Sequence, residues 1–263
     1  MNRYFRYFLF FVIIIQTLFA IAYILRLDFA VSLWPFPNTS RLSFLLIASI
    51  FAAAAASTLW CLLAKEDAAL AGIALDYITI FVPVTILTFQ INAIERSNSL
   101  VLFGIAGAIM IAFGIGLFLW SQSIPFRDSR PTPRPVLVAF VIFVIALLLV
   151  GGALILKTPN ILPWMVTPEG SVVYGWMFLG AAAYFAYGLL RPRWHNAAGQ
   201  LAGFLAYDVV LIVPFIQHFA NVPPELLPNL LVYSLVVGLS GVLALYYLFL
   251  NPETRVWGQK TAA

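Results

Sequence analysis

Residues 68–90 read AALAGIALDYITIFVPVTILTFQ, and residues 197–219 read AAGQLAGFLAYDVVLIVPFIQHF. Crossing the hydrocarbon core of a bilayer, about 30 Å, takes around 20 apolar residues in a helix, and each stretch is that long. Each stretch also carries one aspartate beside a tyrosine, with a proline further along. The two stretches therefore predict membrane-spanning helices that share an unusual polar content.

The composition extends this interpretation to the whole chain. Hydrophobic residues make up 63% of the 263 residues, charged residues only 9%, and the mean hydropathy is +1.00. A soluble domain carries roughly 25% charged residues, so soluble enzymes, nucleic-acid binders and disordered chains are excluded. Cys61 is the only cysteine, which excludes an intrachain disulfide. The apolar runs do not alternate with polar residues as β-barrel strands do. We expect an all-α integral membrane protein with eight transmembrane helices at 7–25, 42–64, 68–90, 100–120, 136–156, 172–190, 197–219 and 230–250.

The positions of the basic residues predict the orientation. With eight spans, both termini share a side with the loops after spans two, four and six. That side holds ten of the fourteen Lys and Arg residues: Arg3, Arg6, Lys65, Arg127, Arg130, Arg134, Arg191, Arg193, Arg255 and Lys260. The positive-inside rule then places both termini in the cytoplasm, in a cell (inner) membrane. The basic balance is thus explained by topology and by anionic headgroups, with no nucleic-acid partner.

The chain also repeats itself at an offset of 131 residues. The matching residues are Arg26 and Lys157, Pro37 and Pro168, Ser40 and Ser171, Gly72 and Gly203, Pro83 and Pro214, and Gly107 and Gly238. Four spans is an even number, so both halves would enter the membrane in the same direction. We expect two parallel four-helix repeats related by a pseudo-two-fold axis along the membrane normal. Residues 1–120 and 136–250 form the halves, 121–135 a Pro- and Arg-rich linker, and 251–263 a tail.

The repeat bears on the first span, which has features of a cleaved signal peptide. Arg3 and Arg6 precede its apolar run, and Ala20-Ile21-Ala22 is similar to a cleavage site. Because the first span pairs with the fifth in the repeat, we expect it to be retained. Small residues also recur every four positions along the fourth span, at Gly104, Ala108, Ala112 and Gly116. We expect them to pack against a neighbouring helix, with a dimer face as the alternative.

Two acids lie within the predicted spans, Asp76 beside Tyr77 and Asp208 beside Tyr207. A carboxylate near the bilayer centre costs about 2.5–3.5 kcal/mol on insertion scales and normally faces protein or water. The order of acid and tyrosine is reversed between the halves, and one residue of displacement rotates a side chain by about 100°. We therefore expect the acids at similar depth, and they need not be exact symmetry mates. Pro83 and Pro214 follow them and are expected to kink the two helices.

These residues allow two functional interpretations. In the first, Asp76, Tyr77, Tyr207 and Asp208 line a central cavity, where the acids bind protons or cations. In the second, each acid is a neutral or hydrogen-bonded packing residue. Gln90, Gln217 and His218 could form a polar vestibule above the acids, or could simply meet headgroups and water.

Enzyme signatures are absent from the sequence. Tyr207-Asp208 resembles the YD motif of the presenilin and signal-peptide-peptidase family, but that family's second acid lies in GxGD. Asp76 instead follows Gly72-Ile73-Ala74-Leu75, the chain order is reversed, and no PAL motif occurs. We expect no enzymatic activity, no cofactor and no metal. The best-supported function is a small-solute or ion transporter. The alternative is an accessory, assembly or scaffold protein that acts through lipids, a membrane partner subunit or a second copy of itself.

Overall fold

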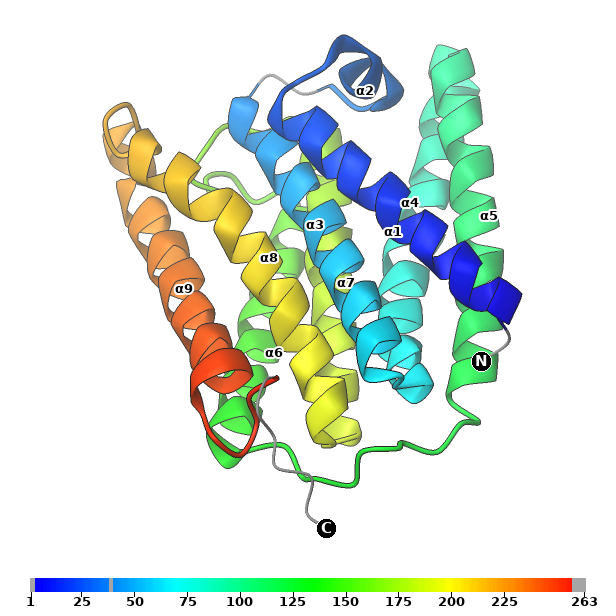
Figure 1. Cartoon of the computed structure of the whole chain (residues 1–263). Helices are drawn as coiled ribbons and strands as arrows, with labels where there is room; N and C mark the ends of the chain where they lie inside the picture. Colours follow the sequence, from blue (N-terminus) through cyan, green and yellow to red (C-terminus); the bar gives the residue numbers. More distant parts are fainter. Residues whose placement is uncertain (1–2, 38–39, 257–263) are drawn as a thin grey trace.

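The computed structural model describes residues 3–37 and 40–256, which form the helical bundle of Figure 1. Lys260, one of the basic residues used to predict the orientation, lies outside the described residues, as does the rest of the tail beyond residue 256. The elements in chain order are α1 (Arg3–Ile24), α2 (Asp28–Leu33), α3 (Arg41–Ala64), η1 (Asp67–Ala69), α4 (Leu70–Glu95), α5 (Asn98–Ser121), α6 (Arg134–Ile155), α7 (Pro168–Leu190), α8 (Trp194–His218), η2 (Pro224–Leu226), α9 (Leu227–Leu245) and η3 (Tyr246–Leu250).

Eight of these helices are long and apolar enough to cross a membrane, so the chain is a multi-pass membrane protein. Each of the eight predicted spans coincides with one of them, to within one residue where a prediction runs past the helix end. Large apolar side chains such as Leu102, Leu149 and Leu235 are exposed on α5, α6 and α9, as expected for helices inside a bilayer. The all-α, eight-span prediction is confirmed; the short helix α2 was not predicted.

The ends of the helices follow from local chemistry. The Ser40 hydroxyl accepts a hydrogen bond from the Leu42 amide at the start of α3, and Thr167 does the same for Gly170 at the start of α7. Several spans end at a basic residue in the left-handed conformation: Arg26, Lys65, Arg96 and Lys157. A cation at this position lies beside the negative end of the helix dipole, which stabilises the termination there.

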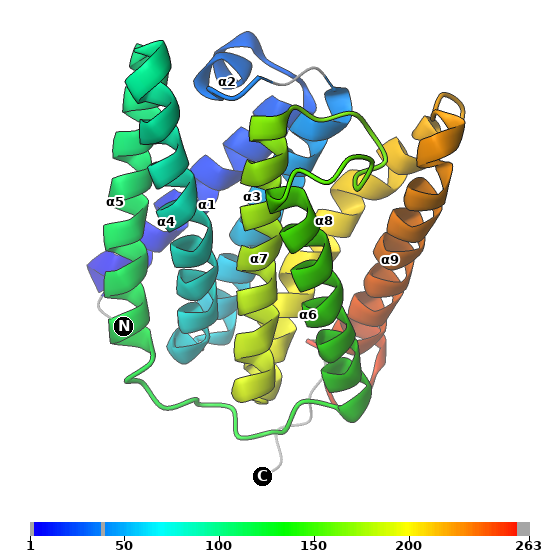
Figure 2. The same ribbon diagram turned by 180° about the vertical axis from the view of Figure 1, so that it is seen from behind.

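The eight spans form two layers of four. In one layer, nearer the viewer in Figure 1, α1 packs on α3, α3 on α8, and α8 on α9. In the other layer, nearer the viewer in Figure 2, α5 packs on α4, α4 on α7, and α7 on α6. The central helix α3 packs most extensively on α8, whereas α4 packs most extensively on α5 and next on α7, so each layer joins helices from before and after the linker.

Glycines permit the closest of these approaches. A Cβ atom at Gly203 of α8 would lie 2.1 Å from the Ser57 hydroxyl of α3. A Cβ atom at Gly72 of α4 would lie 2.8 Å from the Tyr184 ring of α7. Helices in lipid are held together by such close packing, so these glycines join the central helices within each layer.

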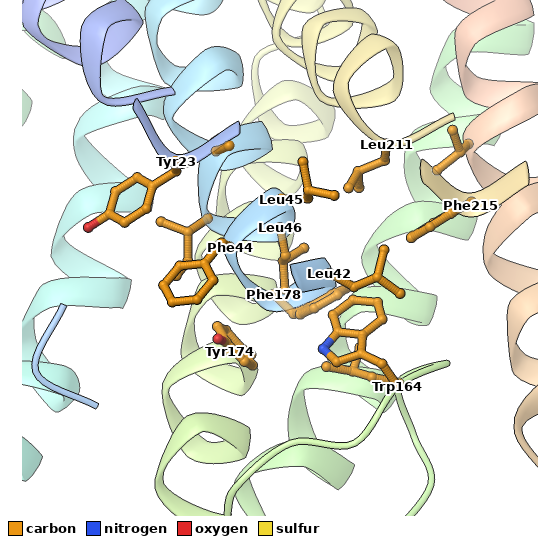
Figure 3. Packing of buried hydrophobic residues seen from close by; sticks show 14 of the residues in the cluster. Tyr23, Leu42, Phe44, Leu45, Leu46, Trp164, Tyr174, Phe178, Leu211 and Phe215 are labelled. Atoms are coloured by element: carbon orange, nitrogen blue, oxygen red, sulfur yellow. The ribbon is translucent and has the colours of Figure 1, made fainter. Parts of the chain in front are cut away.

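An aromatic and aliphatic cluster fills one end of the bundle. Figure 3 shows Trp164, from the loop between α6 and α7, beside Leu42 of α3 and Phe178 of α7. The Trp164 indole donates a hydrogen bond to the Ser43 hydroxyl over 2.9 Å. This loop is therefore fixed to the first turn of α3 and covers that end of the bundle.

The linker between α5 and α6 lies at the opposite end, where both ends of the described chain also lie (Figure 1). It is anchored by backbone hydrogen bonds from the Thr132 amide to the Pro192 carbonyl and from the Trp194 amide to the Arg130 carbonyl. The buried carboxylate of Glu66, in the turn between α3 and α4, accepts hydrogen bonds from the Arg127 and Asp128 amides. The linker thus connects the segment before α4 to the segment before α8.

The small residues of α5 pack differently from the prediction. Gly104, Gly107 and Gly114 face α4, where added Cβ atoms would meet Phe89, Thr85 and Ile78. Gly116 has nothing within 4 Å of such an atom, and Ala108 and Ala112 are exposed. The prediction of a four-residue packing stripe is wrong beyond Gly104, because the contact with α4 follows a different row of residues on the helix surface.

Candidate functional site

A cavity of about 140 Å³ lies between the two layers. Its walls are mostly aliphatic and aromatic, and they come from α3, α4, α6, α7, α8 and α9. The polar side chains among its lining residues are Ser57, Asp76, Tyr184, Gln200, Tyr207 and Tyr233. Asp76 is the one lining residue with an ionisable carboxyl group.

Asp76 lies in the second turn of α4 and is partly exposed to this cavity. Among the described residues, no group forms a hydrogen bond with its carboxylate, and no basic side chain lies within ion-pair distance. The carboxylate packs against α7 at Gly180, where an added Cβ atom would lie 2.4 Å from Asp76 Oδ1. An unpaired carboxylate in apolar surroundings is unfavourable, so this group requires a proton or a cation.

Ser57, Tyr184 and Gln200 lie towards the linker end of the cavity, whereas Tyr233, near the start of α9, packs against Phe178 and Phe215 towards the other end. The Ser57 hydroxyl donates to the Gly199 carbonyl over 3.1 Å, and the Gln200 amide donates to the Tyr184 carbonyl. Gln200 Oε1 and the Tyr233 hydroxyl are buried and have no hydrogen-bond partner among the described residues. The cavity therefore offers a few unused polar atoms in addition to the Asp76 carboxylate.

Asp208 occupies a different environment, between α8 and α9. Its Oδ2 atom accepts a hydrogen bond of 2.9 Å from the Ser240 hydroxyl, and it packs close to Gly241. It is 3% exposed and is not among the residues that line the cavity. The predicted pair of acids is thus separated: Asp76 lines the cavity, and Asp208 is held in a helix–helix contact.

The two tyrosines are separated as well. Tyr207, beside Asp208, lines the cavity. Tyr77, beside Asp76, is turned towards α1, where its hydroxyl accepts a hydrogen bond of 2.6 Å from Gln16. Reversing the order of acid and tyrosine in the two helices therefore places Asp76 and Tyr207 together at the cavity.

Pro83 and Pro214 lie inside α4 and α8. A proline has no amide proton, so the carbonyls of Thr79 and Val210, four residues earlier, lose their helical donors. Both prolines lie beyond the cavity segment of their helix, on the side away from the linker. Each helix therefore has a weakened turn adjoining the cavity wall.

The predicted vestibule residues do not line the cavity. Gln90 and Gln217 are exposed near the ends of α4 and α8. His218 Nε2 lies 2.9 Å from the Pro163 carbonyl and, as the donor, ties the end of α8 to the loop between α6 and α7. The His218 side chain therefore stabilises the packing of this loop, away from the cavity.

A second polar cluster lies at the linker end, outside the cavity. Arg130 forms a salt bridge of 2.8 Å with Asp128, and His195 lies 3.4 Å from Asp128 and 3.9 Å from Glu66. Burial raises the pKa of Glu66, and the two backbone hydrogen bonds only partly offset this. Burial also acts to raise the pKa of Asp128, but hydrogen bonds from Arg130 outweigh it and leave that pKa below its ordinary value. Within the described ranges, no group of three His, Cys, Asp or Glu residues could hold a metal ion.

Comparison with known proteins gives no match to a protein family, to a curated protein or to a solved structure. The site must therefore be interpreted from its own geometry. Sequence reasoning missed four polar residues that line the cavity: Ser57, Tyr184, Gln200 and Tyr233. Each is a polar residue inside a predicted span, so counting hydrogen-bonding side chains as well as charged ones would have found them.

Proposed function

We propose that this protein transports a small organic cation, such as a primary amine with an apolar body, and that Asp76 binds the cationic group. The observation that carries this proposal is the unpaired carboxylate of Asp76 in a cavity whose other walls are mainly apolar and aromatic. Aromatic faces add cation–π attraction to the ionic contact. The size of the cavity supports a small ligand, since an engineered cavity of about 150 Å³ holds benzene.

The proposal also places the cavity on the axis of a parallel repeat. The residue bounds of α1, shifted by 131, are those of α6, and a left-handed basic residue follows each of the two helices, Arg26 and Lys157. The contacts of α3 with α8 and of α4 with α7 exchange under the same offset. In six pairs of residues separated by the same 131 positions, both members line the cavity: 46 and 177, 50 and 181, 53 and 184, 54 and 185, 73 and 204, and 76 and 207. Repeat interfaces are where secondary transporters bind their substrates.

The proposed mechanism is an exchange at one carboxylate. When the ammonium group leaves, a proton takes its place on Asp76, because a bare carboxylate is unfavourable in these surroundings. Pro83 and Pro214 supply the flexible turns for access to the cavity. We propose the orientation in which the linker and both termini are cytoplasmic, in the inner membrane, and we propose no catalytic step.

The test uses Asp208 as a matched control for Asp76. Benzylamine binding to the purified protein is measured for the wild type, Asp76→Asn and Asp208→Asn, with benzyl alcohol as the uncharged analogue. We expect Asp76→Asn to weaken benzylamine binding at least tenfold, to affect benzyl alcohol little, and Asp208→Asn to stay within about twofold of the wild type. Proteoliposomes with a pH gradient should take up benzylamine faster than protein-free liposomes, in which the neutral amine crosses by diffusion, when they contain the wild type or Asp208→Asn, and no faster when they contain Asp76→Asn.

The alternative function, an accessory or scaffold protein, is supported by a different observation. α6 is largely uncovered by the rest of the chain and presents an apolar face, with Val138, Ile142 and Leu149 exposed. Such a face could hold a partner subunit or a second copy. Absence of benzylamine binding in the folded wild type, or equal losses in the two Asp variants, would reject the transporter and favour this alternative.

A further inference from the structure

A second cavity, of about 520 Å³, lies at the linker end of the bundle and is separate from the one at Asp76. It lies between the start of the linker, residues 122–126, and the last turn of α7 with the turn that follows. Figure 2 shows the linker passing beneath the lower end of α7 on its way from α5 to α6. Its lining is much more polar than that of the cavity between the layers and includes Gln122, Ser123, Ser129, Tyr187, Arg191 and Arg193.

The two arginines give this cavity a positive charge that the protein does not neutralise. No acidic residue belongs to the lining, and within the described residues neither Arg191 nor Arg193 forms an ion pair. Arg130, close by on the same linker, contrasts with them because its guanidinium is paired with Asp128. Arg193 is also held in place, since its Nη1 donates to the Ser129 carbonyl over 2.8 Å.

We propose that this cavity binds the phosphate group of an anionic phospholipid. Guanidinium groups bind phosphate oxygens with paired hydrogen bonds, and the hydroxyl of Tyr187 adds a further donor. Basic pockets at the ends of transmembrane helices are where lipid headgroups are recognised. The proposal does not depend on the transport function assigned to Asp76.

The apolar part of the rim favours a lipid as the source of the phosphate. Leu190, the last residue of α7, lines the cavity and is 77% exposed, and Ile124 and Phe126 line it from the linker. A phosphate ion gains no favourable contact from these apolar side chains, whereas an acyl chain or glycerol backbone would pack against them. The bound lipid would belong to the leaflet on the linker side.

Native mass spectrometry of the detergent-purified full chain tests the proposal. The protein is titrated with phosphatidylglycerol or phosphatidylcholine of identical acyl chains. The variant is Arg191→Gln with Arg193→Gln, and the control is Arg3→Gln with Arg134→Gln, which removes the same charge at the same end of the bundle outside the cavity. We expect the wild type to bind phosphatidylglycerol at least tenfold more tightly than phosphatidylcholine, the variant to lose this preference, and the control to keep it.

Further measurements separate the possible outcomes. Inorganic phosphate at millimolar concentration should not displace phosphatidylglycerol; displacement would identify a soluble phosphate compound as the ligand and overturn the lipid assignment. Equal binding of the two lipids by the wild type, or equal losses in the variant and the control, would overturn the site itself. If the double variant does not fold, Arg191→Gln alone, which leaves the contact between Arg193 and Ser129 intact, should lower phosphatidylglycerol binding at least threefold.

Discussion

Asp76 of α4 and Asp208 of α8 both lie inside apolar spans, yet their surroundings differ. Asp208 receives a hydrogen bond from Ser240 and is packed between α8 and α9. Asp76 has no hydrogen-bond partner among the described residues and lines a cavity. A displacement of one residue along the helix accounts for the difference, because it turns the side chain by about 100° onto another face.

The comparison shows that an acid within a membrane span is not in itself evidence of a transport site. Asp208 has one hydrogen-bonded oxygen, Oδ2, and its other oxygen, Oδ1, is buried in the helix–helix contact with no partner among the described residues. Within the same described ranges, Asp76 has no hydrogen bond on either oxygen and lines a cavity instead. What marks a site is a carboxylate that the fold leaves unsatisfied in a space large enough for a ligand. The following changes test this distinction, and the largest expected effect comes first.

The largest effect on stability is expected from filling the space beside Asp76. In Gly180→Ala the new methyl group would lie 2.4 Å from Asp76 Oδ1 and 2.5 Å from the Ile80 side chain. Overpacking of this kind costs about 1–3 kcal/mol, and the displaced carboxylate should also bind benzylamine more weakly. Thermal unfolding in detergent measures the first effect, and the binding assay measures the second.

Gly238→Ala is the matched control, because nothing lies within 4 Å of a Cβ atom at that position of α9. The added methyl group should leave binding unchanged and, through helix propensity, stabilise the protein by up to about 1 kcal/mol. If the two alanine variants lose stability equally, the close contact between Asp76 and α7 is not the feature that matters.

A smaller effect is expected on the Asp208 side. Ser240→Ala leaves the buried Asp208 carboxylate without its donor and should destabilise the protein by about 0.6–1.5 kcal/mol. Ser234→Ala on the same helix removes a buried hydroxyl that has no hydrogen-bond partner among the described residues, and should be close to neutral. Chemical denaturation of both variants compares them, and a Ser234→Ala loss as large as that of Ser240→Ala would contradict the role given to Asp208.

Glu66 sharpens the comparison because it is a buried carboxylate that two backbone amides satisfy. Burial raises its pKa, so the folded protein favours the protonated form. Its contribution to stability is therefore complete below the ordinary glutamate value of 4.5 and is lost as pH rises through the raised pKa. The pKa of Asp128 is lowered, so its contribution to stability is lost only as the pH falls below the ordinary aspartate value.

The expected effect of Glu66 is the smallest of the three. As the pH rises above the ordinary glutamate value of 4.5, the wild type should lose stability relative to Glu66→Gln, which cannot titrate. Unfolding temperatures recorded across this range for both proteins measure the difference. Parallel pH profiles would show that Glu66 does not titrate there and that its pKa is close to the ordinary value.

Much of the fold could be predicted from the sequence. Hydrocarbon thickness fixes the length of an apolar span, so the eight helices follow from the eight apolar runs. The sequence also predicts that Asp76 and Asp208 lie on different faces of their helices, because the order of acid and tyrosine is reversed between the two. Which of the two faces the cavity does not follow, because apolar residues surround both helices and the rotation of each helix is set by its neighbours.

The packing of α5 and the course of the linker show the same limit. Gly104, Gly107 and Gly114 face α4 because of the angle at which these two helices cross, and a sequence does not contain that angle. The linker was expected only as a polar, proline-rich connection. Its attachment to Glu66 and to the Pro192 carbonyl depends on two turns that lie far apart in the sequence.

The attachment of the linker also restricts how the cavity can change shape. The linker is hydrogen-bonded to the turn before α4 and to the turn before α8, so it holds these two helices together at one end. Their cavity segments lie between this fastening and the two prolines. Widening the cavity therefore requires the helices to swing at Pro83 and Pro214, and the swing moves the ends that carry Gln90 and Gln217 further than any other part of them. Under the proposed transport function, the cavity would therefore open at the end remote from the linker.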